Sequence, residues 1–569
     1  MPSAVPAVSR HSPAKGQAES SEIIVEGVVD KPSAWKRAES AHLIVTSKGS
    51  VAELKRVTNN LERLYSLMSR LFHRTATSDD TVKMQITLID TVNFFQTMGL
   101  KNLRSEEGPY AATFVGQRYY DPREDGEVLA VARTDQIIKL STALAEDRDY
   151  ADSMEAGGDG ESAGGADSMI TTANRPPVAR PWEAVLYSAF AQHFLLTYLP
   201  AAYPRWYLDG VGALFSTAEF RRDGKIDYAR APERYRQIFR SYGDLNVGDV
   251  LTGRYLDAAP ANLRWTPYHA WLLTHFFLFS RLKPERSKQF QQYMAAVQRG
   301  DPMAEASKVF GDPKRLQSEL LAYAEKSTEF AHTDAPQAVD GDPLITALTQ
   351  TNAAMIEERI VLGTRLAAPL QNVNDGISSS QRRASWIAQV RAKVAQLPYN
   401  ADAILVEAEV ECRGGEYAAC LASAERVLAK SPDDVRALAW KGTALTYQAL
   451  GLPAGDRAAA LAAARKPIER AIKIDDDSPV VLIAYFRSFV AAGEKVPDSA
   501  MMGLVKVTRE IPAAPVPRLY LAEELVRQGH ADLARRVLYP VLFGAYDSPE
   551  KQAAKELLAS VDTAQPSGQ

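Results

Sequence analysis

The last third of the chain carries a repeated spacing of small residues, and this spacing constrains the fold more than any other feature of the sequence. Counted from Ala401, small residues fall at Ala408 and Cys420, and a proline follows at Pro432. This is the spacing of a repeat unit of about 34 residues made of two antiparallel helices. The next unit, from 435, places Gly442 where the two helices come closest. Since one such hairpin cannot bury its own apolar face, the pattern predicts stacked helical hairpins with a concave groove.

With this spacing, residues 399–562 resemble tetratricopeptide repeats, although the aromatic residue that the family carries at its eleventh position is absent. A last unit near 515–546 fits the spacing, a unit near 479–511 fits poorly, and an insert near 451–463 displaces one second helix. The resemblance implies an all-α array that binds a peptide or protein partner in its groove, or that only caps the first half of the chain. The candidate groove residues are Glu409, Arg413, Arg436 and Tyr447.

A second informative stretch is residues 185–216, which read VLYSAFAQHFLLTYLPAAYPRWYLDGVGALFS. Zinc peptidases of the HExxH type need two histidines four residues apart on one helix, a glutamate between them as general base, and a carboxylate ligand from the next helix. The stretch resembles this arrangement in gluzincin-type metallopeptidases, whose second helix reads approximately W-x-x-E-G-x-A-x-x-F. The matching segments here are AFAQH and RWYLDGVGALF.

On this alignment the residues needed for zinc chemistry are mostly replaced. Ala189 stands at the first histidine, Phe190 at the catalytic glutamate, His193 at the second histidine and Asp209 at the third ligand. Alanine has no ligand atom and phenylalanine cannot act as a base, so two donors remain where a catalytic zinc site normally has three. The resemblance therefore implies a peptidase-type fold that has lost its zinc, and no cofactor is expected.

The residues that hold the helices together are kept. They are Trp206, Gly210, Ala213 and Phe215, and residues 268–277 resemble the later helix that flanks the cleft in this family. We therefore expect a cleft that recognises a peptide or protein partner without hydrolysing it. The candidate recognition residues are Trp206, Tyr207, Tyr268 and His269.

Two alternatives remain open at this point, so enzyme activity is undecided but not favoured. In the first, the protein is an active metallohydrolase whose zinc is held by His193, Asp209 and either His269 or His275. His269 and His275 cannot both bind one ion, because side chains six residues apart on a helix point to opposite faces. In the second, the first half of the chain is only a structural platform and the repeats carry all partner binding.

The domain organisation follows from composition and periodicity. We expect a disordered arm at 1–33, a zincin-like domain at 34–335, a helical connector at 336–398 and the repeats at 399–562. The zincin-like domain would start with an α+β unit and contain a mobile loop at 151–180. Within the α+β unit, the patterns predict strands at 42–47 and 82–90, a helix at 51–72, and a hairpin around the turn at 121–126.

Charge and hydropathy exclude other classes of protein. The chain has 66 Lys plus Arg and 70 Asp plus Glu, with no basic block to neutralise a run of phosphates, so we expect no nucleic-acid partner. The sequence contains no run of 18 apolar residues, so we expect no membrane span. The first residues lack the apolar core of an export signal, which favours the cytoplasm, or the periplasm if an export signal precedes them. The two cysteines, Cys412 and Cys420, are expected as packed thiols rather than a disulfide, and the oligomeric state stays open.

Overall fold

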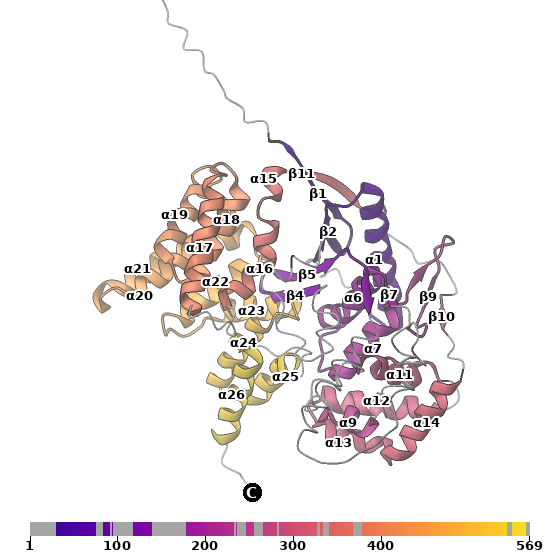
Figure 1. The fold of residues 1–569 in the computed structure, drawn as a ribbon. Helices are drawn as coiled ribbons and strands as arrows, with labels where there is room; N and C mark the ends of the chain where they lie inside the picture. The colour runs from indigo at the N-terminus through magenta and orange to yellow at the C-terminus, as the bar shows by residue number, and fades with distance from the viewer. Residues whose placement is uncertain are drawn as a thin grey trace, which may run out of the picture.

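The computed structural model describes residues 30–74, 83–90, 94, 118–138, 178–232, 235, 246–254, 266–280, 284–326, 330–333, 341–367, 378–542 and 549–564. A mixed sheet with helices forms the first part of the chain, and a long all-helical region follows it (Figure 1). This confirms an α+β part followed by an all-α part. In these residues, no helix is both long enough and apolar enough to cross a membrane.

The first part is built on a six-stranded sheet with the strand order β11-β1-β2-β3-β5-β4. Strands β2, β3 and β5 run parallel to one another, whereas β11, β1 and β4 pair antiparallel with their neighbours. Helix α1, Val51–Leu71, begins at Ser50, whose hydroxyl accepts a hydrogen bond from the backbone nitrogen of Glu53, and packs on β1 and β2. The strands are β1 (Pro32–Glu39), β2 (Leu43–Ser47), β3 (Met84–Ile89), β4 (Arg118–Arg123), β5 (Gly126–Ala132) and β11 (Leu344–Thr349).

The predicted helix at 51–72, the two predicted strands and the hairpin turn at 121–126 are confirmed. Two strands were missed. Strand β1 starts inside the expected arm, and β11 lies inside the expected helical connector and pairs with β1. The reason for the second miss is that β11 is an edge strand with exposed side chains, such as Leu344, so its sequence lacks a buried alternating pattern. Residues 178–180, expected in the loop, form β7 and pair with β6; residues 1–29, 111–117 and 151–177 lie outside the described residues.

A helical layer follows the sheet, and glycines set the distance between its helices. A Cβ atom at Gly210 in α7 would lie 2.0 Å from Thr274 Oγ1 and 2.5 Å from the carbonyl oxygen of Ala270, both in α11. These two helices can therefore pack closely only because residue 210 has no side chain. The elements are α6 (Trp182–Tyr198), α7 (Arg205–Phe215), α9 (Val247–Thr252), α11 (Thr266–Phe279), α12 (Pro284–Gln298), α13 (Met303–Ala306), η3 (Ser307–Phe310) and α14 (Pro313–Glu325). The smaller sheets are β10-β9-β8 (Ala331–His332, Ile226–Tyr228, Glu219–Phe220) and β6-β7 (Gln136–Ile138, Val178–Arg180).

The second part is a stack of antiparallel helices, here called the helical array. Helices α15 (Gln350–Ala353) and α16 (Ile356–Ala367) lead into it from the sheet. A Cβ at Gly442 would lie 2.2 Å from Ile468 Cγ1, so this glycine marks the close contact of α20 with α21, as the repeat spacing predicts. The helices of the array are α17 (Ser379–Ala395), α18 (Ala401–Gly414), α19 (Tyr417–Leu428), α20 (Val435–Leu450), α21 (Ala454–Ile474), α22 (Pro479–Val490), α23 (Asp498–Glu510), α24 (Pro515–Arg527), α25 (Ala531–Leu542) and α26 (Pro549–Ala564).

Two expectations about the array need correction. The segment at 451–463 does not displace the second helix of its hairpin, because α21 begins at Ala454 and includes most of this segment; its run of alanines has high helix propensity. Residues 479–511, which fitted the repeat poorly, form a regular hairpin of α22 and α23.

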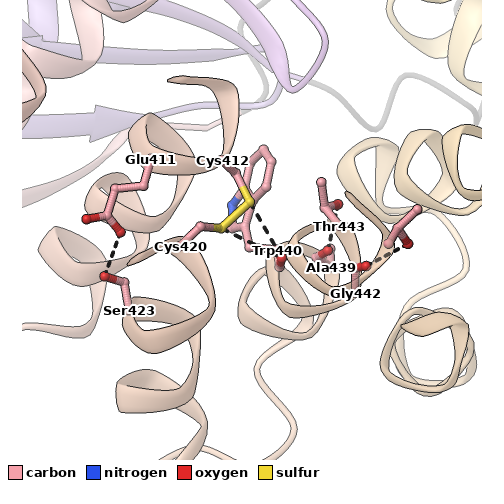
Figure 2. Close-up of a disulfide and its surroundings, with 9 residues drawn as sticks. Glu411, Cys412, Cys420, Ser423, Ala439, Trp440, Gly442 and Thr443 are labelled. Atoms are coloured by element: carbon pink, nitrogen blue, oxygen red, sulfur yellow. Dashed lines mark hydrogen bonds between the residues drawn. A yellow bond between two sulfur atoms is a disulfide. The ribbon is translucent and has the colours of Figure 1, made fainter. Parts of the chain in front are cut away.

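The two cysteines form a disulfide, which corrects the expectation of packed thiols. Cys412 in α18 and Cys420 in α19 are bonded, with their Cα atoms 5.2 Å apart (Figure 2). Gly415, which ends α18 with a φ of 85°, makes the tight turn that brings the two helices together. Both sulfur atoms contact the carbonyl oxygen of Trp440 in α20, at 3.7 and 3.8 Å. The disulfide therefore lies in the packing between the first two hairpins.

Candidate functional site

Helices α6 and α7 carry the four positions that align with the peptidase motif. Ala189 and Phe190 are fully buried, and His193 and Asp209 are 1% and 3% exposed. Phe190 packs near Phe194 of the same helix, with ring centroids 6.4 Å apart. Ala189 and Phe190 are thus part of the apolar core.

The Asp209 carboxylate is neutralised by an arginine. Arg205 Nε, one helical turn earlier in α7, donates to Oδ1 at 3.0 Å and to Oδ2 at 2.9 Å. Gln192 Nε2 from α6 also donates to Oδ1, at 3.2 Å. Gln192 Oε1 in turn accepts a hydrogen bond from Arg118 Nη1 of β4, at 2.9 Å. A guanidinium therefore supplies the positive charge beside the carboxylate that aligns with a zinc ligand.

His193 lies against the sheet rather than toward a shared ligand site. Its ring stacks on Tyr120 of β4, with centroids 3.6 Å apart and planes 12° from parallel. Burial and the positive charge of Arg118 hold the pKa of His193 well below its usual value. The imidazole is therefore neutral at pH 7.

The residues at this position do not fit a catalytic zinc ion. Zinc would need a third protein ligand where Ala189 stands, and it would have to displace Arg205 from Asp209. Over the described part of the chain, no group of three or more His, Cys, Asp or Glu side chains is placed to hold a metal ion. His275, proposed as a substitute ligand, has its Nδ1 within 2.8 Å of the Tyr323 hydroxyl.

The expected recognition residues divide into buried and surface groups. Trp206 is fully buried and Tyr207 is 5% exposed, so neither is accessible to a partner in this conformation. Trp206 Nε1 donates to Tyr293, whose hydroxyl donates to the carbonyl oxygen of Leu251 at 2.9 Å. Tyr268 and His269 are partly exposed in α11, and burial lowers the pKa of His269 to about 4.

A buried carboxyl group lies near Tyr120, the residue that stacks on His193. Glu127 of β5 is 3% exposed and accepts a hydrogen bond from the Thr197 hydroxyl of α6. Burial raises the pKa of Glu127 to about 7, while hydrogen bonds from Thr197 and Tyr120 partly counteract the rise. Since Tyr120 also stacks on His193, an acid with a near-neutral pKa lies close to His193.

The four candidate groove residues do come together, but another segment of the same chain lies beside them. Glu409 and Arg413 of α18 and Arg436 of α20 form an ion-paired set, with Glu409 accepting from both arginines at 3.0 Å. The end of the β4–β5 hairpin, residues 121–126 and here called the hairpin tip, reaches this set. Tyr447 lies beside it and accepts a hydrogen bond from Arg487 of α22 at 2.8 Å.

Several residues of these two regions were missed from the sequence. The four-residue spacing of Arg205 and Asp209 is a local signal that indicates an ion pair on a helix. In contrast, Arg118 and Gln192 meet across 74 residues, and the hairpin tip meets the array across almost 300, so no local pattern indicates either contact.

No protein-family model, curated protein or solved structure that was compared matches this chain. Its function therefore has to be argued from the residues and their geometry.

Proposed function

We propose that this protein is a non-catalytic polypeptide-binding protein, in which a gluzincin-like first domain without its zinc centre is joined to tetratricopeptide-like hairpins. The observation that carries the proposal is the pairing of Asp209 with Arg205 and Gln192. A carboxylate that shares its oxygens with a guanidinium is no longer a free metal ligand. At the same time, Ala189 and Phe190 provide neither the missing ligand nor the general base.

The helical array supports polypeptide binding as the remaining activity. The first helices of its hairpins present charged and aromatic side chains to one segment of folded chain, the hairpin tip. This is the kind of surface with which helical repeats bind peptides or protein loops. The disulfide favours the alternative in which the protein is exported, because disulfides persist mainly in oxidising compartments.

Elemental analysis of the natural chain tests the loss of zinc. The chain is purified without chelators, incubated with zinc and desalted, and we expect far less than one zinc per chain. Hydrolysis of casein and of a mixed peptide library should match that of a buffer control. Stoichiometric zinc together with hydrolysis would show that the protein is an active metallohydrolase and would refute the proposal.

A restored variant tests the origin of the site. It combines Ala189→His, Phe190→Glu, Asp209→Glu and Arg205→Ala, because the guanidinium has to leave before a carboxylate can bind zinc. We expect this variant to retain zinc. The matched control keeps Phe190 and carries the other three substitutions; it should bind zinc but hydrolyse nothing, since it lacks the general base. A restored variant that folds but gains no zinc would contradict the gluzincin-like arrangement.

A further inference from the structure

The array surrounds the hairpin tip with side chains from four helices, here called the inner face. Two ion pairs connect them: Arg413 Nη2 lies 3.6 Å from Glu124 Oε2, and Arg436 Nη2 lies 3.8 Å from Asp125 Oδ2. The inner face comprises Glu409, Arg413, Arg436, Tyr447, Arg487 and Tyr520, from α18, α20, α22 and α24.

The charges of the inner face and the hairpin tip are complementary. The inner face has three arginines and one carboxylate, and Arg359 of α16 adds a further positive charge nearby. The tip contributes three carboxylates and one arginine, which pairs with its neighbour Asp121 at 2.9 Å. Burial alone would lower the pKa of Arg413, but the carboxylates of Glu124 and Glu409 outweigh this effect and raise it. Without the tip, the inner face would carry an excess of positive charge.

The tip nevertheless fits the inner face imperfectly. The ion pairs between them, at 3.6 and 3.8 Å, are longer than hydrogen bonds, whereas the two within the inner face are 3.0 Å. Asp125 Oδ1 and Arg436 Nε are both buried, and neither makes a hydrogen bond to any described residue. An unsatisfied acceptor and an unsatisfied donor on the two sides of one contact mark an interaction that a better-placed carboxylate would improve.

From this geometry we infer that the inner face is the docking site for an acidic segment of a partner protein, and that the hairpin tip is an internal competitor for that site. The inference rests on the proposed function, since it names the partner chemistry of the same array. The partner segment carries adjacent carboxylates, as Glu124 and Asp125 do, and can approach Arg436 with both carboxylate oxygens. The tip lowers the apparent affinity by the fraction of time for which it covers the inner face.

Fluorescence anisotropy with a synthetic peptide tests this inference on the full chain. The peptide has the sequence of residues 118–127, RYYDPREDGE, a fluorescent label, and one cysteine added at each end that closes it into a ring. The tip variant Glu124→Ala/Asp125→Ala should bind this ring at least about tenfold more tightly than the natural chain. A neutral ring, with Gln and Asn at the positions of Glu124 and Asp125, should bind at least about tenfold more weakly than the acidic ring.

Matched variants assign the binding to the inner face. Adding Arg436→Glu to the tip variant should abolish binding, while adding Arg470→Glu, an exposed arginine of α21, should not. Asp223→Ala is made in the natural chain and removes an acid that precedes a glycine in the β8–β9 turn. It should leave the affinity of the chain for the acidic ring unchanged. If the double tip variant does not fold, Asp125→Asn replaces it because the side chain keeps its shape, with the same direction expected.

The possible failures separate the two proposals. Equal affinity of the natural chain and the tip variant for the acidic ring would overturn the competition and leave polypeptide binding intact. Equal affinity for the acidic and neutral rings would overturn the acidic partner. Binding of neither ring to any chain would overturn this inference together with the binding part of the proposed function, while zinc analysis still decides the non-catalytic part separately.

Discussion

Replacing Arg205 by alanine tests whether its guanidinium compensates the buried charge of Asp209. The substitution removes the guanidinium that donates to both oxygens of Asp209. The carboxylate is 3% exposed, and the hydrogen bond that it accepts from Gln192, at 3.2 Å, stays in place. The variant therefore leaves a buried negative charge without its positive partner.

The size of the effect follows from this geometry. Breaking a buried ion pair by removing one partner costs about 3–5 kcal/mol. Gln192 still donates to the carboxylate, and the Arg205 side chain is 15% exposed, so water would enter where it stood. We therefore expect a loss near the lower end, about 3 kcal/mol, which corresponds to a roughly hundredfold rise in the opening equilibrium of α7.

The loss should also depend on pH. Without the guanidinium, burial raises the pKa of the Asp209 carboxyl above the value of about 3.9 in the unfolded chain. The folded variant then binds more protons than the unfolded chain above that pH, so the stability of the variant falls as pH rises. Urea denaturation at pH 5 and pH 8, together with hydrogen exchange of residues 205–215 by mass spectrometry, measures both effects.

The matched control is Arg315→Ala. Arg315 and Glu319 have the same four-residue spacing in α14, at 3.3 Å, but the Arg315 side chain is 73% exposed. Arg315 is exposed and Glu319 keeps its ion pair with Arg286, at 2.8 Å, so we expect the loss of Arg315 to cost about 0–1 kcal/mol. If Arg205→Ala destabilises the chain no more than Arg315→Ala, or loses no additional stability between pH 5 and pH 8, the guanidinium is not compensating a buried charge and the argument is wrong.

Three further outcomes are expected. Gly210→Ala should destabilise the chain by about 2 kcal/mol, because the new Cβ overlaps the Thr274 side chain and the backbone of α11. Gly455→Ala is the control and should not destabilise the chain, because a Cβ at this position has no neighbouring atom within 4 Å. The urea midpoints of the two variants give the comparison. Glu127→Gln should gain stability relative to the natural chain as pH rises from 5 to 8, by about 3 kcal/mol at most. The reason is that Glu127 has a raised pKa of about 7, so the folded natural chain loses stability through this range. Melting temperatures of both chains against pH measure this difference, and parallel curves would contradict it. Reducing the disulfide between α18 and α19 should lower the free energy of unfolding by about 2 kcal/mol, since it releases a short loop in the unfolded chain. The urea midpoint with and without reductant measures the loss, and an unchanged midpoint would show that the bond adds no stability.

Much of the fold could be predicted because its signals are local. The three-to-four-residue apolar spacing predicts α1, and the small residues at Ala408, Cys420 and Gly442 predict the first two hairpins. Strand β11 could not be predicted, because its side chains are largely exposed and its pairing with β1 spans about 300 residues. The disulfide was not predicted because the spacing of Cys412 and Cys420 fits two packed thiols as well as a bridge.

The candidate site shows the same division. The sequence shows that Ala189 offers no ligand atom and Phe190 no base, and it shows the spacing of Arg205 and Asp209. The support that Gln192 receives from Arg118 is not visible, because it depends on how α6 packs against β4.

The sequence by itself determined helix α1, the first two helical hairpins, and the residue types at the positions that align with the peptidase motif, because residue type and short-range spacing decide these properties. Only the tertiary structure decided that a guanidinium accompanies Asp209 as part of a network reaching β4, and that the hairpin tip covers the inner face of the array. Both contacts bring together elements far apart in the chain. Charged groups in them can be buried only where packing places an opposite charge beside them, and that placement is a property of the folded molecule.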